Sequence, residues 1–213
     1  MKIISPSHEI LFMQDGTSIL KQIETAGRTC YKSENKITAD SAAGFVKSII
    51  KSGHHSVVEH ISISVRFICD RGITHEIVRH RLAAYSQEST RYANYSKDKF
   101  GNEITVIKPY FWSEDSEEYS EWKIAMKNAE QSYLKLLKNG ARPEQARSVL
   151  PNSLKTEIIM TCNLREWRHV LDLRCSKASH PQIREIMLPL LTELHEKIPV
   201  LFDDLYSKYL CSA

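Results

Sequence analysis

The sequence ISISVRFIC, at residues 61–69, carries the clearest secondary-structure signal in the chain. Ile61, Ile63, Val65, Phe67 and Cys69 alternate with mostly polar residues, a period of two that predicts a strand with one apolar face. An alternating strand of this kind favours an antiparallel or mixed sheet covered by helices over a helical bundle. We therefore predict an α/β protein of the α+β type, with a central and mostly antiparallel sheet.

The segments on either side of this strand complete the expected fold. Apolar periodicity and turn residues predict further strands at 2–13 (broken near Pro6), 104–107 and 154–162. They predict helices at about 17–30, 41–52, 71–81, 113–138, 143–150, 163–174, 181–197 and 199–211. The expected helix caps are Thr17 or Ser18, Asp40 or Ser41, Asp70 and Asn163. No repeat or linker divides the chain, so one domain over residues 1–213 is expected.

Composition excludes several classes of protein. The 213 residues are 42% apolar and 26% charged, with a net charge of +3 that is too weak to indicate a nucleic-acid polymer or a membrane surface as partner. No apolar run approaches eighteen residues and the N-terminus lacks a signal-peptide pattern, so we expect a cytoplasmic protein. The five cysteines form no CxxC pair, which argues against a zinc ribbon or a thioredoxin-like site. The glycines never form GxGxxG or GxxxxGK, so neither a Rossmann fingerprint nor a P-loop is present.

A basic stretch, RHRLAAYSQESTR at residues 79–91, is the strongest candidate for a binding site. Arg79, Arg81 and Arg91 carry planar donor forks suited to phosphate oxygens or an anionic ring edge. His80 can stack, donate or accept a hydrogen bond, and the hydroxyl and amide groups that follow supply neutral hydrogen bonds. A basic helix end followed by a polar loop is the alternative interpretation.

The histidines do not predict a local metal site. A zincin needs two histidines at i and i+4, whereas His75 and His80 are five residues apart and would point about 140° apart on a helix. We therefore expect no metal. Glu76 and His80, at i and i+4, could orient one another on such a helix.

Two further groups of residues accompany the basic stretch. His54, Ser56, Glu59 and His60 precede the alternating strand. The C-terminal half contains ARSVLP at 146–151, followed by Asn163-Leu164-Arg165, His169, Leu173-Arg174 and His180. RHR, followed by seven residues and Ser89, completes a set of three blocks. The three blocks resemble the flavin-dependent thymidylate synthases, and the resemblance covers most of residues 53–180.

This resemblance implies a reaction and a site. Members of the family methylate C5 of dUMP to give dTMP, taking the carbon from methylenetetrahydrofolate and the hydride from FAD that NADPH has reduced, and they assemble as homotetramers with shared active sites. By similarity, FAD would contact Ser56, Arg79, His80, Arg81, Gln87, Asn163, Leu164, Arg165 and His169. By similarity, dUMP would contact Glu76, Ile77, Val78, Arg79, Gln87, Glu88, Ser89, Thr90, Arg91, Arg147 and Arg174. Arg174 would be catalytic, favouring the N3-deprotonated uracil, and His54 would lie near the flavin and assist orientation or proton movement.

Some residues differ from the common family pattern, and other functions stay open. Gln87 stands where many relatives have Glu, and Glu76 where many have Gln, which puts the details of ligand contact in doubt. No Pro-Cys-His occurs, so the cysteine nucleophile of the classical thymidylate synthase is absent, and we interpret Ser89 as a phosphate ligand.

The alternatives are a non-catalytic nucleotide or nucleic-acid binding module using the Arg79–Arg91 cluster, a metal-dependent nucleotide hydrolase, and an inactive family member that does not retain flavin.

Overall fold

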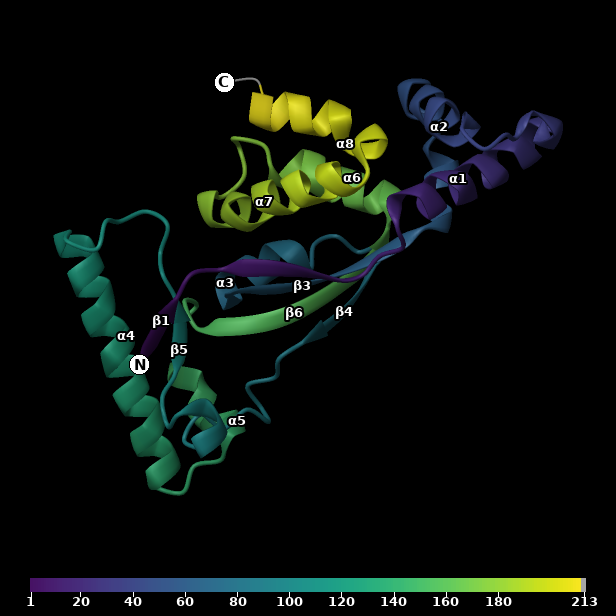
Figure 1. The fold of residues 1–213 in the computed structure, drawn as a ribbon. Coiled ribbons are helices and arrows are strands. Elements are labelled where there is room, and N and C mark those ends of the chain that lie inside the picture. Colours follow the sequence, from purple (N-terminus) through teal and green to yellow (C-terminus); the bar gives the residue numbers. More distant parts are fainter. Residues whose placement is uncertain (212–213) are drawn as a thin grey trace. The chain divides into compact units, whose positions relative to one another are not determined.

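A computed structural model describes residues 1–211 of the protein (Figure 1). Its strands are β1 (Lys2–Ile4), β2 (Ser7–Phe12), β3 (Ser62–Asp70), β4 (Ala83–Gln87), β5 (Thr105–Ile107) and β6 (Lys155–Asn163). Its α-helices are α1 (Gly16–Tyr31), α2 (Ser41–Lys51), α3 (Arg71–Ile77), α4 (Glu117–Lys138), α5 (Pro143–Ala146), α6 (Leu164–Arg174), α7 (Pro181–Lys197) and α8 (Pro199–Tyr206). A 3₁₀ turn at His55–His60 precedes β3, and a π-helical turn at Ser207–Cys211 follows α8.

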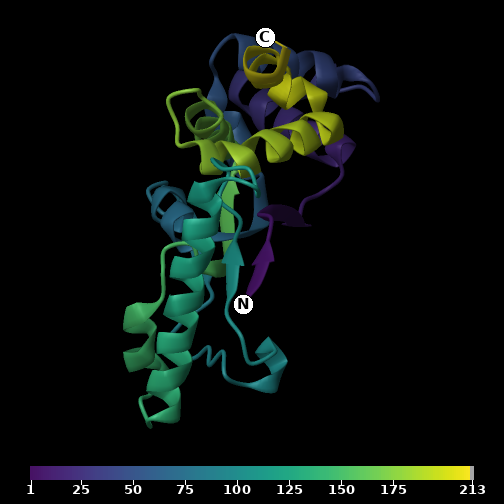
Figure 2. The same cartoon turned by 90° about the vertical axis from the view of Figure 1, so that its left-hand side faces the viewer.

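The strands form two sheets. An antiparallel four-stranded sheet has the order β2-β3-β6-β4, and a small parallel sheet pairs β1 with β5. The first strand, at the N mark, lies beside β5 in both views (Figures 1 and 2). The predicted fold class, a mostly antiparallel sheet with helices and no Rossmann fold, is confirmed.

Contacts divide the chain into two compact units, each assembled from three segments. Unit 1 comprises residues 1–7, 67–79 and 85–159, and unit 2 comprises residues 8–66, 80–84 and 160–213. Each strand of the four-stranded sheet, β2, β3, β4 and β6, contributes residues to both units. The expectation of a single domain over residues 1–213 stays a prediction.

The core of unit 1 is built around α4, the long teal helix in Figures 1 and 2. Tyr119, Trp122, Met126 and Tyr133 recur at helical spacing and are buried in one cluster with Val106 of β5 and with Leu154. Ser116 caps the helix by accepting a hydrogen bond from the Tyr119 amide at 3.1 Å. Burying each such side chain contributes about 1.5–3 kcal/mol, so this stripe is the main reason that α4 stays attached.

The core of unit 2 is centred on Trp167 of α6, which is fully buried. Its indole Nε1 donates a 3.0 Å hydrogen bond to the Ile63 carbonyl oxygen, so a large apolar side chain is buried without leaving its polar atom unpaired. The Leu164 amide donates to the Ile61 carbonyl oxygen at 2.9 Å, which joins the start of α6 to the start of β3. These two bonds fix the position of α6 within unit 2.

Two glycines of unit 2 have a structural reason, one in its packing and the other in its backbone conformation. An added Cβ on Gly27 would lie 2.6 Å from the Phe45 ring, so a side chain there would separate α1 from α2. Gly53 has a φ of 71°, a left-handed conformation that ends the turn after α2 at low cost for glycine. Ser52 is the C-cap residue of α2, and Gly53 follows it.

Some local predictions were wrong. Asp15 rather than Thr17 or Ser18 caps α1, accepting from the Ser18 amide at 3.0 Å. Residues 83–87, for which no strand was predicted, form β4, an outer strand of the four-stranded sheet. Glu76 and His80 were predicted to lie on one helix, but α3 ends at Ile77, so they do not share a helix face. None of the helices in residues 1–211 combines the length and apolar character that a membrane-spanning segment needs.

Candidate active site

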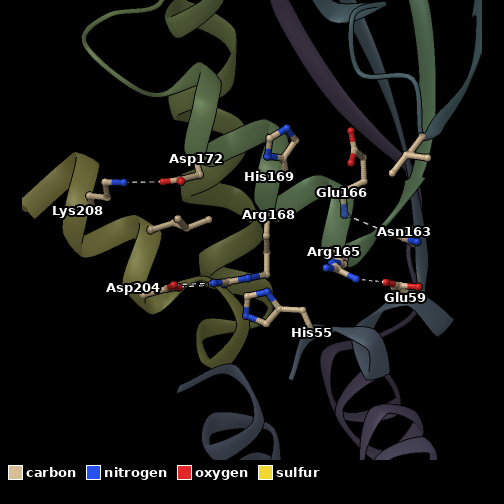
Figure 3. A pocket seen from close by; sticks show the side chains of 12 residues that line it. His55, Glu59, Asn163, Arg165, Glu166, Arg168, His169, Asp172, Asp204 and Lys208 are labelled. Carbon is tan, nitrogen blue, oxygen red and sulfur yellow. Dashed lines mark hydrogen bonds and ion pairs between the residues drawn. The ribbon is translucent and has the colours of Figure 1, made fainter. Parts of the chain in front are cut away.

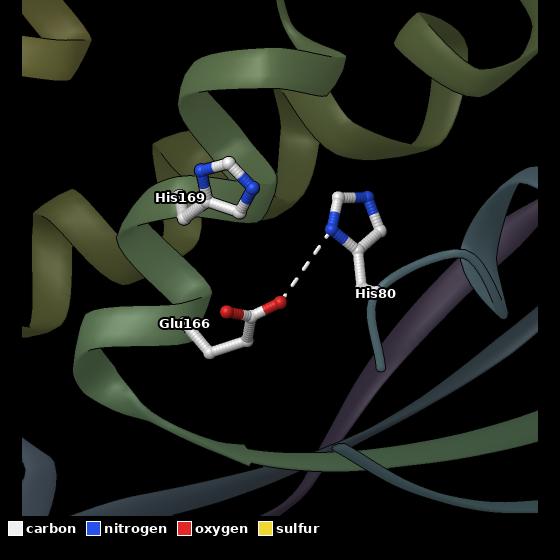
Figure 4. A group of neighbouring side chains, drawn as sticks. All are labelled: His80, Glu166 and His169. Carbon is white, nitrogen blue, oxygen red and sulfur yellow. Dashed lines mark ion pairs between the residues drawn. The ribbon is translucent and has the colours of Figure 1, made fainter. Parts of the chain in front are cut away.

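A buried imidazole, that of His80, joins two charged side chains of α6 in unit 2. His80 is only 4% exposed. Its Nε2 accepts a hydrogen bond of 3.0 Å from the Arg174 Nε, and its Nδ1 lies 3.6 Å from a carboxylate oxygen of Glu166 (Figure 4). The His169 ring stands edge-on to the His80 ring, with 5.8 Å between the ring centroids.

Helix α6 brings these partners together because of where it begins. Asn163 is the last residue of β6. Its side chain accepts a hydrogen bond of 3.0 Å from the Glu166 amide and so caps the helix as predicted. Glu166 and His169 are then three residues apart on one helix face, and Arg174 lies at the last position of the helix. The Trp167 anchor between them holds that face in place.

The surroundings of His80 keep its ring neutral. Burial, the nearby Arg174 guanidinium and the nearby His169 lower the pKa of His80 to about 4. The imidazole is therefore uncharged at neutral pH, and one of its two nitrogens carries the hydrogen. An uncharged ring can accept a hydrogen bond from a guanidinium, which an imidazolium could not.

The face of α6 that carries His169 also borders a cavity of about 1080 Å³ within unit 2 (Figure 3). Three ion pairs line it: Arg165 with Glu59 at 2.5 Å, Arg168 with Asp204 at 2.6 Å, and Lys208 with Asp172 at 2.8 Å. Its other lining residues are His55, Leu82, Asn163, Glu166, His169 and Leu205. The wall thus combines cations, carboxylates and neutral donors with two leucines.

Arg168 and Asp204 form the most buried of these pairs. The residue Arg168 is 8% exposed, and its guanidinium reaches Asp204 through two nitrogens and also donates to the Leu201 carbonyl oxygen. Burial raises the pKa of Asp204, but the hydrogen bonds and charge of Arg168 outweigh burial and lower that pKa below its usual value. The pair ties α8 to α6 beside the cavity.

A second set of polar side chains lies in unit 1, around the end of β4. The Gln87 amide nitrogen donates to the hydroxyls of Thr74 at 3.1 Å and Thr156 at 3.3 Å. The exposed Arg147 donates to the hydroxyl of the buried Thr90 at 3.3 Å. These contacts fix both ends of the segment 87–90.

Glu88, within the same segment, is already engaged by its neighbours. Its carboxylate accepts from Lys155 at 3.0 Å and from the Tyr95 hydroxyl at 3.1 Å. Burial lowers the pKa of Lys155, but hydrogen bonds to Glu157 and Glu88 outweigh burial and raise it. These side chains border a smaller cavity of about 330 Å³ in unit 1.

Comparisons with known proteins identify the family. Residues 14–200 match the family model described as thymidylate synthase complementing protein. The chain is 34% identical over 167 residues to the flavin-dependent thymidylate synthase of Pyrococcus abyssi, covering 78% of this chain and 68% of the relative. It is 36% identical over 195 residues to that of Mycobacterium tuberculosis (strain ATCC 25177 / H37Ra), covering 85% and 78%. The chain belongs to the flavin-dependent thymidylate synthase family.

A solved structure agrees on the fold of this flavin-dependent thymidylate synthase family member. A UMP/dUMP methylase from Streptomyces cacaoi, bound with 5-Br dUMP, superposes with a TM-score of 0.76 over 98% of each chain. At 22% sequence identity, this structural similarity shows the fold alone. Membership of the family confirms the prediction that the protein is an enzyme.

The residues that the family resemblance singled out are divided between the two units. Unit 1 holds Glu76, Ile77, Val78, Arg79, Gln87, Glu88, Ser89, Thr90, Arg91 and Arg147. Unit 2 holds His54, Ser56, His80, Arg81, Asn163, Leu164, Arg165, His169 and Arg174. Within unit 2 the structure joins His80 to Arg174 directly, and it places Asn163, Arg165 and His169 around one cavity. His54 lies apart from that wall, with its Nδ1 3.1 Å from the Tyr31 hydroxyl.

Sequence reasoning missed several residues of this site. Glu166 follows the cap residue Asn163 by three positions, a spacing typical of a helix-capping pair, so the sequence offers no sign of its contact with His80. The pair Arg168–Asp204 was also missed, because its members are 36 residues apart. One nitrogen or oxygen each from His80, Glu166 and His169 lie within 4.8 Å of one another, a set that could hold a metal ion and that local spacing could not reveal.

Proposed function

We propose that the protein catalyses the reductive methylation of dUMP to dTMP, with FAD as cofactor, methylenetetrahydrofolate as carbon donor and NADPH as reductant. One dUMP, one methylenetetrahydrofolate, one NADPH and one proton give dTMP, tetrahydrofolate and NADP⁺. Family membership over residues 14–200 supports this reaction. Within the structure, the observation that supports it most is the bond between Arg174 and the neutral ring of His80, because both belong to family motifs.

The cavity in unit 2 fits a flavin by size and by chemistry. Its volume of about 1080 Å³ is slightly above the usual range for small-molecule sites, which suits a ligand as large as a dinucleotide. Arg165 supplies a cation for phosphate oxygens, while Asn163 and His169 supply neutral hydrogen-bonding groups. Of the residues that we assign to FAD, Asn163, Arg165 and His169 line this cavity. The other assigned residues are Ser56, Arg79, His80, Arg81, Gln87 and Leu164. Bound FAD would supply the hydride transfer that no side chain can perform.

Arg174 is the group we assign to activation of dUMP. A guanidinium beside the uracil N3 and O2 stabilises negative charge on the ring and so favours the N3-deprotonated form. The bond from Nε to His80 holds the guanidinium, which limits its motion before substrate binds. His54 would assist orientation or proton movement near the flavin.

The remaining dUMP contacts would come from unit 1. We assign them to Glu76, Ile77, Val78, Arg79, Gln87, Glu88, Ser89, Thr90, Arg91 and Arg147. The bond between Arg147 and Thr90 supports this assignment, because it holds a cation next to the loop that carries Ser89 and Arg91. The Glu88 carboxylate accepts from Lys155 and Tyr95, and its amide donates to the Glu157 carbonyl oxygen at 2.9 Å, so Glu88 is fixed before a ligand binds. We further propose a cytoplasmic homotetramer of single-domain chains with shared active sites.

The first experiment is an absorbance spectrum of the purified protein with FAD, followed by an assay of dTMP formation. We expect a flavin band that shifts on addition of dUMP, and dTMP only when dUMP, methylenetetrahydrofolate and NADPH are all present. Arg174→Gln should lose at least a hundredfold in kcat, since it removes the charge that stabilises the ring. Arg142→Gln is the matched control, because Arg142 is largely exposed and its partner is Glu144 in unit 1.

Two outcomes would refute this function. Protein that neither binds FAD nor responds to dUMP, but binds polymer with strong salt dependence, would instead be a binding module using the Arg79–Arg91 cluster. Protein that binds dUMP but retains no flavin and forms no dTMP would be an inactive member of the family.

A further inference from the structure

The buried carboxylate of Glu166 has no part in the function proposed so far. Glu166 is 7% exposed, and its ion-pair contact is with the ring of His80. A buried carboxylate costs free energy unless a neighbouring group compensates it. Glu166 lies beside the His80 ring, which in turn accepts a hydrogen bond from Arg174 (Figure 4). This position indicates that the buried carboxylate has a function in the site.

The geometry decides which nitrogen of His80 carries the hydrogen. The Nε of Arg174 can only donate, so the Nε2 of His80 must be the nitrogen with the free lone pair. A neutral ring then carries its hydrogen on Nδ1, the nitrogen that faces the Glu166 oxygen at 3.6 Å. The opposite tautomer would set two N–H groups against each other at Arg174 and a lone pair against the carboxylate.

We propose that Glu166 is a positioning residue that holds His80 in the Nδ1–H tautomer, so that Nε2 is available to hold the Arg174 guanidinium. In this role Glu166 acts through His80, although its residue also lines the cavity of unit 2. The inference rests on the proposed function only in that Arg174 is the group assigned to activate dUMP. A carboxylate that fixes the tautomer of a histidine is a general device for orienting the ring's other nitrogen.

A metal ion bound by the same side chains is the competing explanation. The ligand atoms of His80, Glu166 and His169 lie within 4.8 Å of one another. A cation there would replace the Nδ1 hydrogen and would lie close to the fixed positive charge of Arg174, whose Nε is 3.0 Å from the same ring. Repulsion by that guanidinium disfavours the ion, whereas it favours a neutral ring that accepts its hydrogen bond.

Solid-state ¹⁵N NMR of protein labelled in histidine and arginine measures the tautomer directly. The His80 signals are assigned by their loss in His80→Gln, and the Arg174 Nε signal by its loss in Arg174→Lys. We expect the wild type to show a protonated Nδ1 and an unprotonated Nε2. Glu166→Leu should give a mixture of tautomers, shift the Arg174 Nε signal and lower kcat for dTMP about tenfold.

Two further variants make the test specific. Glu166→Gln keeps the shape and one acceptor oxygen, so it should recover part of the Nδ1–H tautomer and part of kcat, and it decides the question if the leucine variant does not fold. Asp172→Asn removes a carboxylate from the same helix and the same cavity, but the contacts of Asp172 are with Lys208 and Tyr209, so the His80 signals should not change.

The outcomes separate the two proposals. An Nε2–H tautomer in the wild type, or unchanged His80 and Arg174 signals in both Glu166 variants, would overturn the positioning role. Stoichiometric Zn²⁺ in the purified protein that is lost in Glu166→Gln would also overturn it, in favour of a metal site. The expected tautomers in a protein that forms no dTMP would keep the positioning role and refute the proposed function.

Discussion

Removing the carboxylate of Asp204 should destabilise the protein through Arg168. In Asp204→Ala the buried guanidinium loses two hydrogen bonds to Asp204 and keeps the one to the Leu201 carbonyl oxygen. Hydrogen bonds to charged groups contribute about 1.5–3 kcal/mol, and breaking a buried pair costs about 3–5 kcal/mol. The Asp204 side chain is 53% exposed, so water replaces part of the loss and we expect about 2 kcal/mol. For a chain of this length the melting temperature should fall by about 4–8 °C.

The neighbouring carboxylate Asp203 provides a matched control. It lies on the same helix, is 56% exposed and pairs with His195, whose side chain is 23% exposed against 10% for Arg168. Asp203→Ala should therefore cost less than about 1 kcal/mol. Thermal unfolding by circular dichroism, at one protein concentration and one flavin content, compares the two variants with the wild type.

The pH dependence tests the charge of Asp204 itself. Its pKa is lower in the folded protein than the usual value near 3.8, so folding favours the ionised form. The contribution of this carboxylate to the free energy of unfolding is therefore present above about pH 4 and is lost as the pH falls through the pKa of the folded protein. The difference between wild type and Asp204→Ala should be constant from pH 5 to 8 and shrink below about pH 4. Two results would refute the reasoning. One is a loss of stability in Asp204→Ala no larger than that in Asp203→Ala, and the other is a stability difference between wild type and Asp204→Ala that does not change at low pH.

Three further predictions concern other buried groups. Because the pKa of His80 is lowered to about 4, the unfolded chain binds more protons than the folded protein between about pH 4 and 6.5. The free energy of unfolding should therefore decrease as the pH is lowered through this range, by at most about 1.4 kcal/mol per pH unit, and His80→Gln should flatten that slope in urea titrations. Thr156→Val, which removes a fully buried hydroxyl that accepts from Gln87, should cost about 1 kcal/mol in urea unfolding, and a neutral or stabilising effect would contradict the bond. Thiol labelling of the native protein should modify two cysteines quickly and three only after unfolding, because burial raises the pKa of the three inner thiols. Rapid modification of a third cysteine would contradict the burial of these thiols in the core. The fast pair is Cys30 and Cys211, and the slow set is Cys69, Cys162 and Cys175.

Local sequence signals were sufficient for most of the fold. The alternation at 61–69 predicted β3, and Asp70 and Asn163 were predicted as caps and accept the amide hydrogens of Ile73 and Glu166. These features depend on residues within a few positions of one another, where periodicity and capping chemistry act directly.

The segments that the sequence misassigned depend on distant partners. Strand β4 has a short sequence of mostly small or polar residues, and its neighbour in the sheet is β6, about seventy residues later. The 3₁₀ turn at His55–His60 leads into β3 as predicted, but its turn structure was not predicted. Neither structure follows from local propensity, because tertiary pairing overrides it.

The candidate site shows the same division. The family resemblance named His80, His169 and Arg174 from their motifs, and the structure brings all three together in unit 2. Glu166 escaped notice because its spacing from Asn163 already had a capping explanation, and its contact with His80 joins residues 86 positions apart in the sequence. Contacts of that range are not encoded in any short pattern.

The pairing of β3 with β6 sets a delay during synthesis. The hydrogen bond from Trp167 to Ile63 joins residues 104 positions apart, so β3 leaves the ribosome long before the segment that covers it. At about 5–20 residues per second, the interval is roughly 5–20 s, during which Ile63, Val65 and Phe67 lie on a strand with one unpaired edge. Such an edge pairs readily with other chains. The soluble yield of newly made protein should therefore depend on what shields this strand while the ribosome completes the second half of the chain.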